Sequence, residues 1–226
     1  GRLHVRRRQA ERDRVVLLIA DFRPPMFWGV SRAFRSVAAA EALCLIGWSA
    51  AEAGGRVGLL AITGGEAAVA RPRGRARGML DAIGAMVAAH RAGLAAMRRG
   101  LAETPPLDAA LAPVERLAPP GAELVLASGF DETGPELRDR LDALARRRAP
   151  RLVEVVDAAA GALPRGRYPI RLPGGRRARV RLDGGARPER LSRELAGRQA
   201  LIVDAGDPAE ATARRIAAAF PQGRAA

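Results

Sequence analysis

Residues 15–30, which read VVLLIADFRPPMFWGV, decide the fold. The first six are apolar, which is too short for a free-standing helix and typical of a strand buried on both faces in a parallel sheet. Asp21 closes this strand, and the two prolines after Arg23 cannot continue ladder pairing before a helical pattern begins near Ser31. The order is therefore strand, tight loop and helix. Asp21 lies at the carboxyl end of the strand, where open α/β sheets build their sites.

Strand and helix patterns alternate along the rest of the chain. We predict further buried strands at residues 57–62, around 125, and at 152–156 and 200–204. We predict helices at about 31–53, 76–101, 107–117, 135–148, 187–195 and 208–220. In the second of these helices, the apolar members are Leu80, Ile83, Val87 and Met97.

Two further stretches predict antiparallel pairing. Residues 66–70 suit an antiparallel edge strand next to the strand at 57–62. Residues 165–183 alternate apolar and polar side chains around a Gly-Gly turn, which predicts a small β-hairpin insertion. The whole pattern is typical of a doubly wound, Rossmann-type α/β fold with a mostly parallel sheet and an antiparallel edge strand.

The Asp-terminated first strand, its proline loop and the strand RVGLLAI at 56–62 resemble the opening of a von Willebrand factor A domain. More narrowly, the chain resembles bacterial von Willebrand-like proteins of unknown function that are associated with MoxR-type AAA+ ATPases. The stretches TPPL at 104–107, ELVLASGFD at 123–131 and 153–164 agree in order and spacing. The resemblance implies a single von Willebrand A-like domain over residues 15–226. The basic segment 1–14 before it allows a short edge strand.

Domains of this type hold a divalent cation with oxygen ligands from a strand-end Asp, two serines, a threonine and a second Asp. By this resemblance the five ligand positions fall on Asp21, Arg23, Pro25, Thr104 and Gly129, so two ligands of five survive. A guanidinium at about 4 Å would repel the ion by roughly 8 kcal/mol at an effective dielectric of 20. We therefore expect a degenerate metal-ion-dependent adhesion site without metal or cofactor. In it Arg23 takes the place of the cation and pairs with Asp21 or Asp131.

The resemblance implies a non-enzymatic scaffold whose loops at 21–30, 104–106 and 129–134 bind a protein partner. That partner would be a MoxR-type AAA+ ATPase or its client, in complex assembly or chaperone-like maturation. Phe27 and Trp28 are either core anchors or exposed hot-spot residues, and Arg23 could take a partner's acid directly. The expected partner-binding residues are Asp21, Arg23, Pro25, Phe27, Trp28, Thr104, Gly129 and Asp131.

Two other functions are weighed against this scaffold. A metal-dependent hydrolase or phosphatase-like enzyme would use Asp21, Asp131 and Asp157 at the carboxyl edge, but the sequence offers no nucleophile with a paired base. Nucleic-acid binding is raised by the formal charge of +14, and all 38 basic residues are arginines. These arginines are interleaved with acids, and aromatic residues make up only 4%, so we do not expect nucleic acid as a partner.

Cysteine usage and hydropathy bear on location. One cysteine, Cys44, excludes an intrachain disulfide and fits a reducing compartment, so a cytoplasmic location is expected. No apolar run approaches the roughly 20 residues that cross a bilayer. Because the sequence starts with Gly1 rather than Met, we expect a fragment of a longer protein, which a membrane anchor or another domain could precede.

Overall fold

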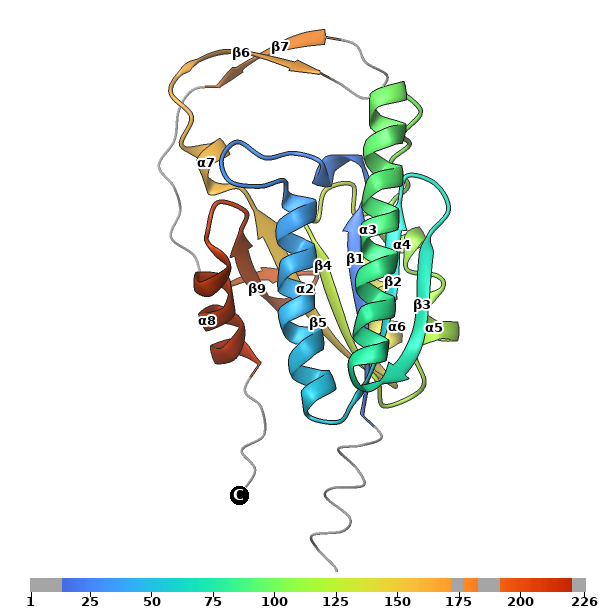
Figure 1. Cartoon of the computed structure of the whole chain (residues 1–226). Helices are drawn as coiled ribbons and strands as arrows, with labels where there is room; N and C mark the ends of the chain where they lie inside the picture. The colour runs from blue at the N-terminus through green and yellow to red at the C-terminus, as the bar shows by residue number, and fades with distance from the viewer. Residues whose placement is uncertain (1–13, 172–176, 183–191, 221–226) are drawn as a thin grey trace, which may run out of the picture.

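The computed structural model describes residues 14–171, 177–182 and 192–220. At its centre lies a seven-stranded sheet in the order β3-β2-β1-β4-β5-β9-β8 (Figure 1). The five inner strands are parallel, whereas β3 and β8 run antiparallel to their neighbours at the two edges. The strands are β1 (Val15–Phe22), β2 (Arg56–Thr63), β3 (Ala68–Gly74), β4 (Glu123–Ser128), β5 (Ala149–Val156), β8 (Ser192–Leu195) and β9 (Arg198–Asp204).

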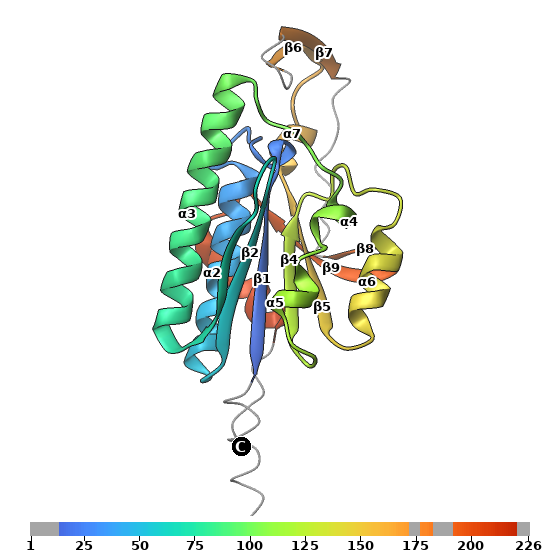
Figure 2. The same ribbon diagram turned by 90° about the vertical axis from the view of Figure 1, so that its right-hand side faces the viewer.

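Helices cover both faces of this sheet and give the molecule three layers (Figure 2). One face carries α2 (Arg35–Glu52), α3 (Arg75–Arg99) and α8 (Ala209–Ala219). The other face carries α4 (Leu107–Ala110), α5 (Val114–Leu117) and α6 (Leu137–Ala145). The predicted α/β fold with a mostly parallel, Rossmann-like sheet is confirmed.

Strand β1 is the centre of both cores because its side chains alternate between the two faces. Leu18 and Phe22 pack with α2 and α3, whereas Leu17 and Ile19 pack with the helices of the opposite layer. All eight residues of the strand are buried. The apolar run predicted to be an inner strand therefore has that position.

The strand order shows at which end of the sheet a site is expected. From β1 the chain passes through α2 to β2 on one side, and β4 pairs with β1 on the other side. The order therefore reverses between β1 and β4, and such a switch point leaves a crevice at the carboxyl ends of the two strands. The pairing of Ala20 with Ala127 brings Asp21 and Ser128 to this crevice together.

The predicted hairpin insertion is also confirmed. Strands β6 (Gly166–Arg171) and β7 (Arg177–Leu182) pair antiparallel as a separate two-stranded sheet. The glycine turn between them lies outside the described residues. The hairpin follows α7 (Ala158–Gly161), a short helix directly after β5.

The helix predicted at 187–195 is wrong over the described part of that range, because Ser192–Leu195 forms the edge strand β8. This strand turns back into β9 through Ala196 and Gly197, which both have positive φ, at 48° and 76°. Two left-handed residues are the geometry of a type I′ hairpin turn, for which Asn-Gly is the usual signal. Ala-Gly is a weaker signal for such a turn, so the sequence did not predict the hairpin. Because β8 pairs antiparallel with β9, the sheet has two antiparallel edges rather than the one predicted.

Two other elements differ from prediction near prolines. The edge strand predicted at 66–70 is β3, which continues to Gly74 through Pro72, because an edge strand tolerates a residue that cannot donate to a ladder. The single helix predicted at 107–117 is two short helices, α4 and α5, with Pro113 between them.

The predicted apolar face of α3 is wrong for two of its members, since Leu80 is 59% exposed and Val87 is 43% exposed. The side that faces the sheet consists of small residues and methionines: Gly78, Met79, Ala82, Met86 and Ala89. Hydrophobicity alone favoured the larger side chains. Close contact between α3 and β2–β3 instead requires the small ones, because a Cβ on Gly78 would lie 2.0 Å from the carbonyl oxygen of Arg73.

The edge strand expected within residues 1–14 falls almost wholly outside the described residues, which begin at Arg14. Within the described ranges, no helix has both the length and the apolar character that a membrane span needs.

Candidate functional site

A buried ion pair between Asp21 and Arg23 occupies the switch point. Asp21 is 1% exposed and Arg23 is 0% exposed. The guanidinium of Arg23 donates from Nε to Asp21 Oδ1 at 2.9 Å and from Nη2 to Oδ2 at 2.8 Å, a bidentate pair. The backbone N–H of Arg23 also donates to Oδ1, at 3.0 Å. Both carboxylate oxygens of Asp21 are therefore engaged by its neighbour.

The remaining donors of Arg23 bind backbone carbonyls of two other loops. Nη1 donates to the oxygens of Pro105, at 2.7 Å, and Glu132, at 2.9 Å. Nη2 also donates to the oxygen of Asp131, at 2.9 Å. A guanidinium has five N–H donors, and each has an acceptor here. One side chain thus ties the loop after β1 to the loops at 104–106 and 129–134.

Ser128, at the end of β4, completes the shell around Asp21. Its hydroxyl donates to Asp21 Oδ2 at 2.6 Å and accepts the N–H of Phe130 at 2.9 Å. Sequence reasoning did not place Ser128 in the site. The signal was available, because the residue ends the strand paired with β1, the same position that drew attention to Asp21.

Gly129 and Asp131 shape the next part of the site around Arg35 of α2. The Arg35 Nη2 forms an ion pair with Asp131 Oδ2, and a Cβ on Gly129 would lie on this guanidinium. The absence of a side chain at 129 therefore makes room for Arg35. Burial raises the pKa of the Asp131 carboxyl above its usual range, and the charge of Arg35 opposes this rise.

The residues of this site do not fit a divalent cation. The oxygens of Asp21 already bind a guanidinium, Pro25 and Gly129 offer no side-chain ligand, and the 104–106 loop contacts Arg23 through the Pro105 carbonyl. Thr104 is half-buried in that loop. In the part of the chain that the structure describes, no three His, Cys, Asp or Glu side chains gather in a way that could hold a metal.

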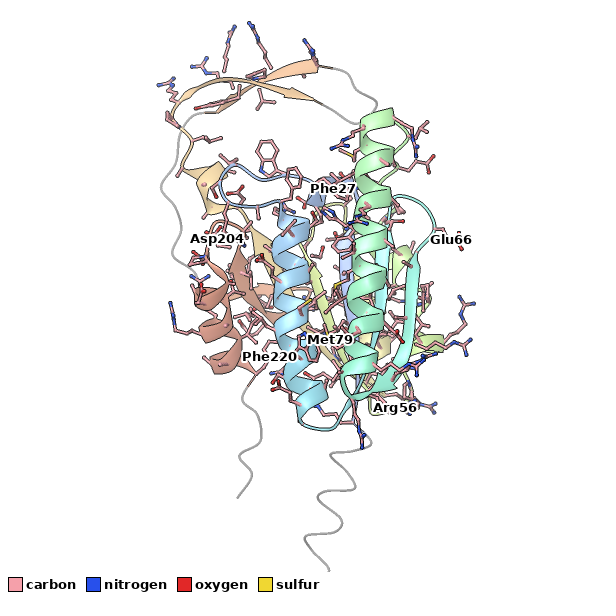
Figure 3. All side chains as sticks on the ribbon, in the orientation of Figure 1. Phe27, Arg56, Glu66, Met79, Asp204 and Phe220 are labelled. Carbon is pink, nitrogen blue, oxygen red and sulfur yellow. The ribbon has the colours of Figure 1, made fainter. Side chains whose placement is uncertain are left out.

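The sequence did not decide whether Phe27 and Trp28 lie in the core or on the surface. In the structure the burial of the two side chains differs. Phe27 is half-buried beside α3, with its ring centroid 5.1 Å from that of His90 (Figure 3). Trp28 is 43% exposed, and two further large apolar side chains of the same loop are exposed, Val30 at 38% and Phe34 at 39%.

The loop that carries these side chains is anchored at both ends of its exposed part. The N–H of Val30 donates to Asp157 Oδ2 at 2.5 Å, and the N–H of Arg35 donates to the oxygen of Trp28 at 2.8 Å. Asp157 therefore holds a loop at the end of β5.

Burial lowers the pKa of His90, which contacts the Ser36 hydroxyl at 3.1 Å beneath Phe27.

The chain matches the sequence profile of one known family, described as protein of unknown function DUF58, over residues 1–177. It belongs to this family. The match includes Asp21, Arg23, Ser128, Asp131 and Asp157, so the candidate site lies within the family's own region. No curated protein matches the chain.

Two hypotheses raised by the sequence do not fit the geometry of this DUF58 site: direct binding of a partner's acid by Arg23, and the acid–base alternative to the scaffold. Arg23 was expected to take a partner's acid directly, but it is fully buried and every donor is used. The carboxylates considered for acid–base chemistry, Asp21, Asp131 and Asp157, do not face one another as a free set. Asp21 binds Arg23, Asp131 binds Arg35, and Asp157 binds the backbone of the 27–34 loop.

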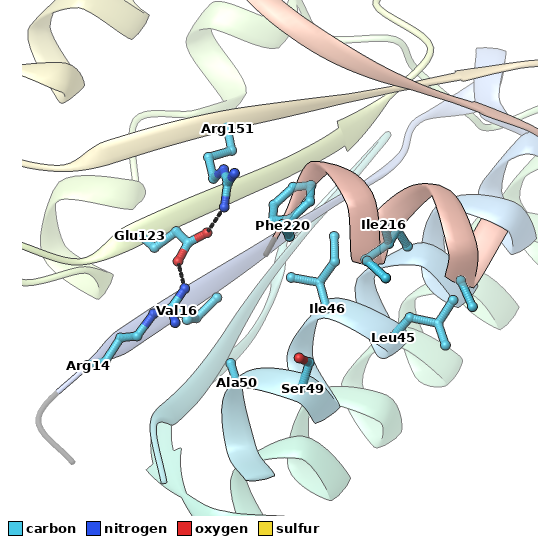
Figure 4. A pocket seen from close by; sticks show the side chains of 12 residues that line it. Arg14, Val16, Leu45, Ile46, Ser49, Ala50, Glu123, Arg151, Ile216 and Phe220 are labelled. Carbon is cyan, nitrogen blue, oxygen red and sulfur yellow. Dashed lines mark hydrogen bonds and ion pairs between the residues drawn. The ribbon is translucent and has the colours of Figure 1, made fainter. Parts of the chain in front are cut away.

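A separate pocket of about 210 Å³ lies between β1, α2 and α8, at the end of the molecule opposite the switch point (Figure 4). Glu123 lies there between Arg14 and Arg151, and Arg151 stacks 3.8 Å from the ring centroid of Phe220. Its charged groups thus bind one another. This end lies away from the switch point, where open α/β sheets bind ligands.

Proposed function

We propose that the chain is a non-enzymatic protein-interaction scaffold of the von Willebrand A type, which binds its partner through the carboxyl-edge loops without a metal ion. The observation that carries this proposal is the exposed apolar group Trp28, Val30 and Phe34, on a loop next to the saturated Asp21–Arg23 pair. Aromatic side chains that emerge from a fixed backbone are the usual anchors of protein interfaces.

Preorganisation of the loops supports binding rather than chemistry. Arg23 joins three loops, and Asp157 fixes the loop of Trp28, so little conformational entropy would be lost on association. The side chains that could act in catalysis already bind other groups of the chain. Ser128 donates to Asp21, and His90, the histidine within the described residues, contacts Ser36.

The partner class comes from the family resemblance. We propose a MoxR-type AAA+ ATPase or its client in the cytoplasm, with the scaffold acting in complex assembly or chaperone-like maturation. A metal-dependent hydrolase at the same edge is the alternative. It is less favoured because both carboxylate oxygens of Asp21 already bind Arg23.

The proposal is tested with the full chain and the double variant Trp28→Ala, Phe34→Ala. Binding to a purified MoxR-type ATPase of the same organism is measured by surface plasmon resonance. The loop variant should bind at least tenfold more weakly than the wild type, because each lost anchor is worth about 1–2 kcal/mol. The double variant Leu80→Ala, Val87→Ala removes comparable exposed apolar groups from α3 and should bind like the wild type. Equal binding by both variants, or none by the wild type, contradicts the proposal.

A further inference from the structure

The last turns of α3 extend beyond the sheet that the helix covers. The helix has 25 residues, but its buried residues end at Ala89. Figure 2 shows it continuing past the carboxyl ends of β1 and β2. Its inner face stays apolar over this stretch, where Gly93, Ala96 and Met97 are only half-buried. The sheet therefore leaves part of an apolar helix face uncovered.

A groove of about 440 Å³ lies along this part of α3. Its other walls come from the turn between β2 and β3 and from the loop after β1. Figure 3 labels one residue of each wall, Glu66 and Phe27, beside the upper half of α3. We call this surface the α3 groove, and the lining residues that matter below are Phe27, Glu66, Ala92, Met97 and Leu101.

Close backbone contacts form the groove without help from a partner. Gly93 leaves room for the ring of Phe27, because a Cβ on Gly93 would lie 2.5 Å from the ring carbon Cζ. Gly64 lets the β2–β3 turn approach the chain that follows α3, because its Cβ would lie 2.2 Å from the carbonyl oxygen of Glu103. A preformed groove loses little conformational entropy when it binds.

The charge at the α3 groove is negative, although the chain as a whole carries +14. Among the described residues of its lining, Glu66 alone carries a charge, and Glu66 is exposed. The arginines at 91, 98 and 99 of α3 are exposed but do not line the groove. Interactions between exposed charges are largely screened beyond about 8 Å at physiological salt. The carboxylate in the lining therefore decides which charge the groove attracts.

We propose that the α3 groove binds an aromatic side chain of a protein partner, two positions away from a lysine or arginine in an extended segment. Aromatic rings pack well edge to face and against thioether sulfur, and Phe27 and Met97 offer both contacts. Residues two positions apart in an extended segment share a face and lie about 6.6 Å apart. The basic side chain can then pair with Glu66 while the ring enters the groove.

The chemistry of the lining favours such a segment over lipid or nucleic acid. Lipid headgroups of the anionic type and phosphates would meet the carboxylate of Glu66 and be repelled. A concave apolar site with one polar group instead suits a single anchoring side chain and its neighbour. The α3 groove is separate from the exposed group Trp28, Val30 and Phe34, none of which lines it, so the inference goes beyond the proposed function.

The experiment follows the amide signals of the full ¹⁵N-labelled chain by NMR during titration with the capped peptide Gly-Ser-Phe-Ser-Lys-Ser-Gly. Two matched peptides replace Phe by Ala or Lys by Glu. The variant Ala92→Leu fills the groove at an exposed position, and Glu66→Gln removes its charge. The control Ala76→Leu makes the first change at an exposed position of α3 outside the groove. The spectra also show that each variant is folded.

The Phe-Ser-Lys peptide should bind the wild type and Ala76→Leu alike and shift the amides of Gly65, Gly93 and Met97. Ala92→Leu should weaken binding at least about tenfold by excluding the ring. Glu66→Gln should weaken it about two- to fivefold, the usual effect of one exposed ion pair, and abolish the preference for Lys over Glu. The double variant Trp28→Ala, Phe34→Ala should bind the peptide normally, so failure here is distinct from failure of the proposed function.

Four results would overturn the proposal. They are no binding of the Phe-Ser-Lys peptide, equal binding of all three peptides, and unchanged binding by Ala92→Leu. The fourth is a shift of the same amides when the chain alone is concentrated, which would mean that a second copy occupies the groove.

Discussion

At the scale of residues, Arg23 explains how three loops are held together, because its one side chain binds all of them. Its pairing with Asp21 could be predicted, because the two residues are separated by one position at the end of a buried strand. Its contacts with the carbonyls of Asp131 and Glu132 could not. They depend on a loop in which Phe130 and Glu132 adopt positive φ, at 55° and 47°, and residues without special left-handed preference give no sequence signal for such a turn.

Replacing Arg23 by alanine should lower the free energy of unfolding by about 3–5 kcal/mol, the usual cost of leaving one buried charge without its partner. The affected charge is Asp21, which is 1% exposed. Urea denaturation measures the change. Arg23→Lys should also destabilise the chain, because an ammonium cannot reproduce the bidentate geometry.

The matched control for this variant is Arg32→Ala. Arg32 also pairs with a carboxylate in a bidentate manner, that of Glu41, but the pair is exposed. Exposed pairs contribute at most about 1 kcal/mol. If Arg23→Ala cost no more than Arg32→Ala, Arg23 would not be the residue that holds the loops.

At the scale of elements, α3 marks the limit of hydrophobic periodicity. The pattern identified the helix, and its bounds differ by two residues or fewer from the prediction. It did not identify the buried face, since Leu80 and Val87 are exposed and Gly78 is buried. Which face packs is decided here by how closely the backbones approach, and that distance depends on β2 and β3, not on α3 itself.

Two glycines of α3 provide a direct test of this close packing. Gly78→Ala should destabilise the chain by about 1–3 kcal/mol, the range for overpacking, because its Cβ would meet the backbone oxygens of Arg73 and Val57. Gly84→Ala, on the same helix, meets nothing within 4 Å. It should stabilise the chain by up to about 1 kcal/mol through helix propensity. Thermal or urea denaturation of the pair checks both signs, and two stabilising substitutions would contradict the observed packing.

At the scale of the whole molecule, the alternation of buried strands and helices was sufficient to predict the α/β layers and the hairpin at 165–183. Edge details were harder to predict because they depend on turn geometry, as in the Ala196–Gly197 turn that makes Ser192–Leu195 a strand. From the interleaving of arginines with acids, the sequence did not suggest nucleic acid as a partner. Several of these arginines pair with carboxylates on the described part of the molecule, as Arg32 does with Glu41 and Arg198 with Asp142.

We infer that a guanidinium, and not a metal ion, fixes the carboxyl-edge loops. The most direct measurement is the thermal unfolding midpoint of the wild-type chain in EDTA and in magnesium chloride, at matched ionic strength. A bound ion would raise the midpoint by mass action. We predict the same midpoint in both, because the Asp21 oxygens already bind Arg23. A higher midpoint in magnesium that disappears in Asp21→Asn would contradict the claim.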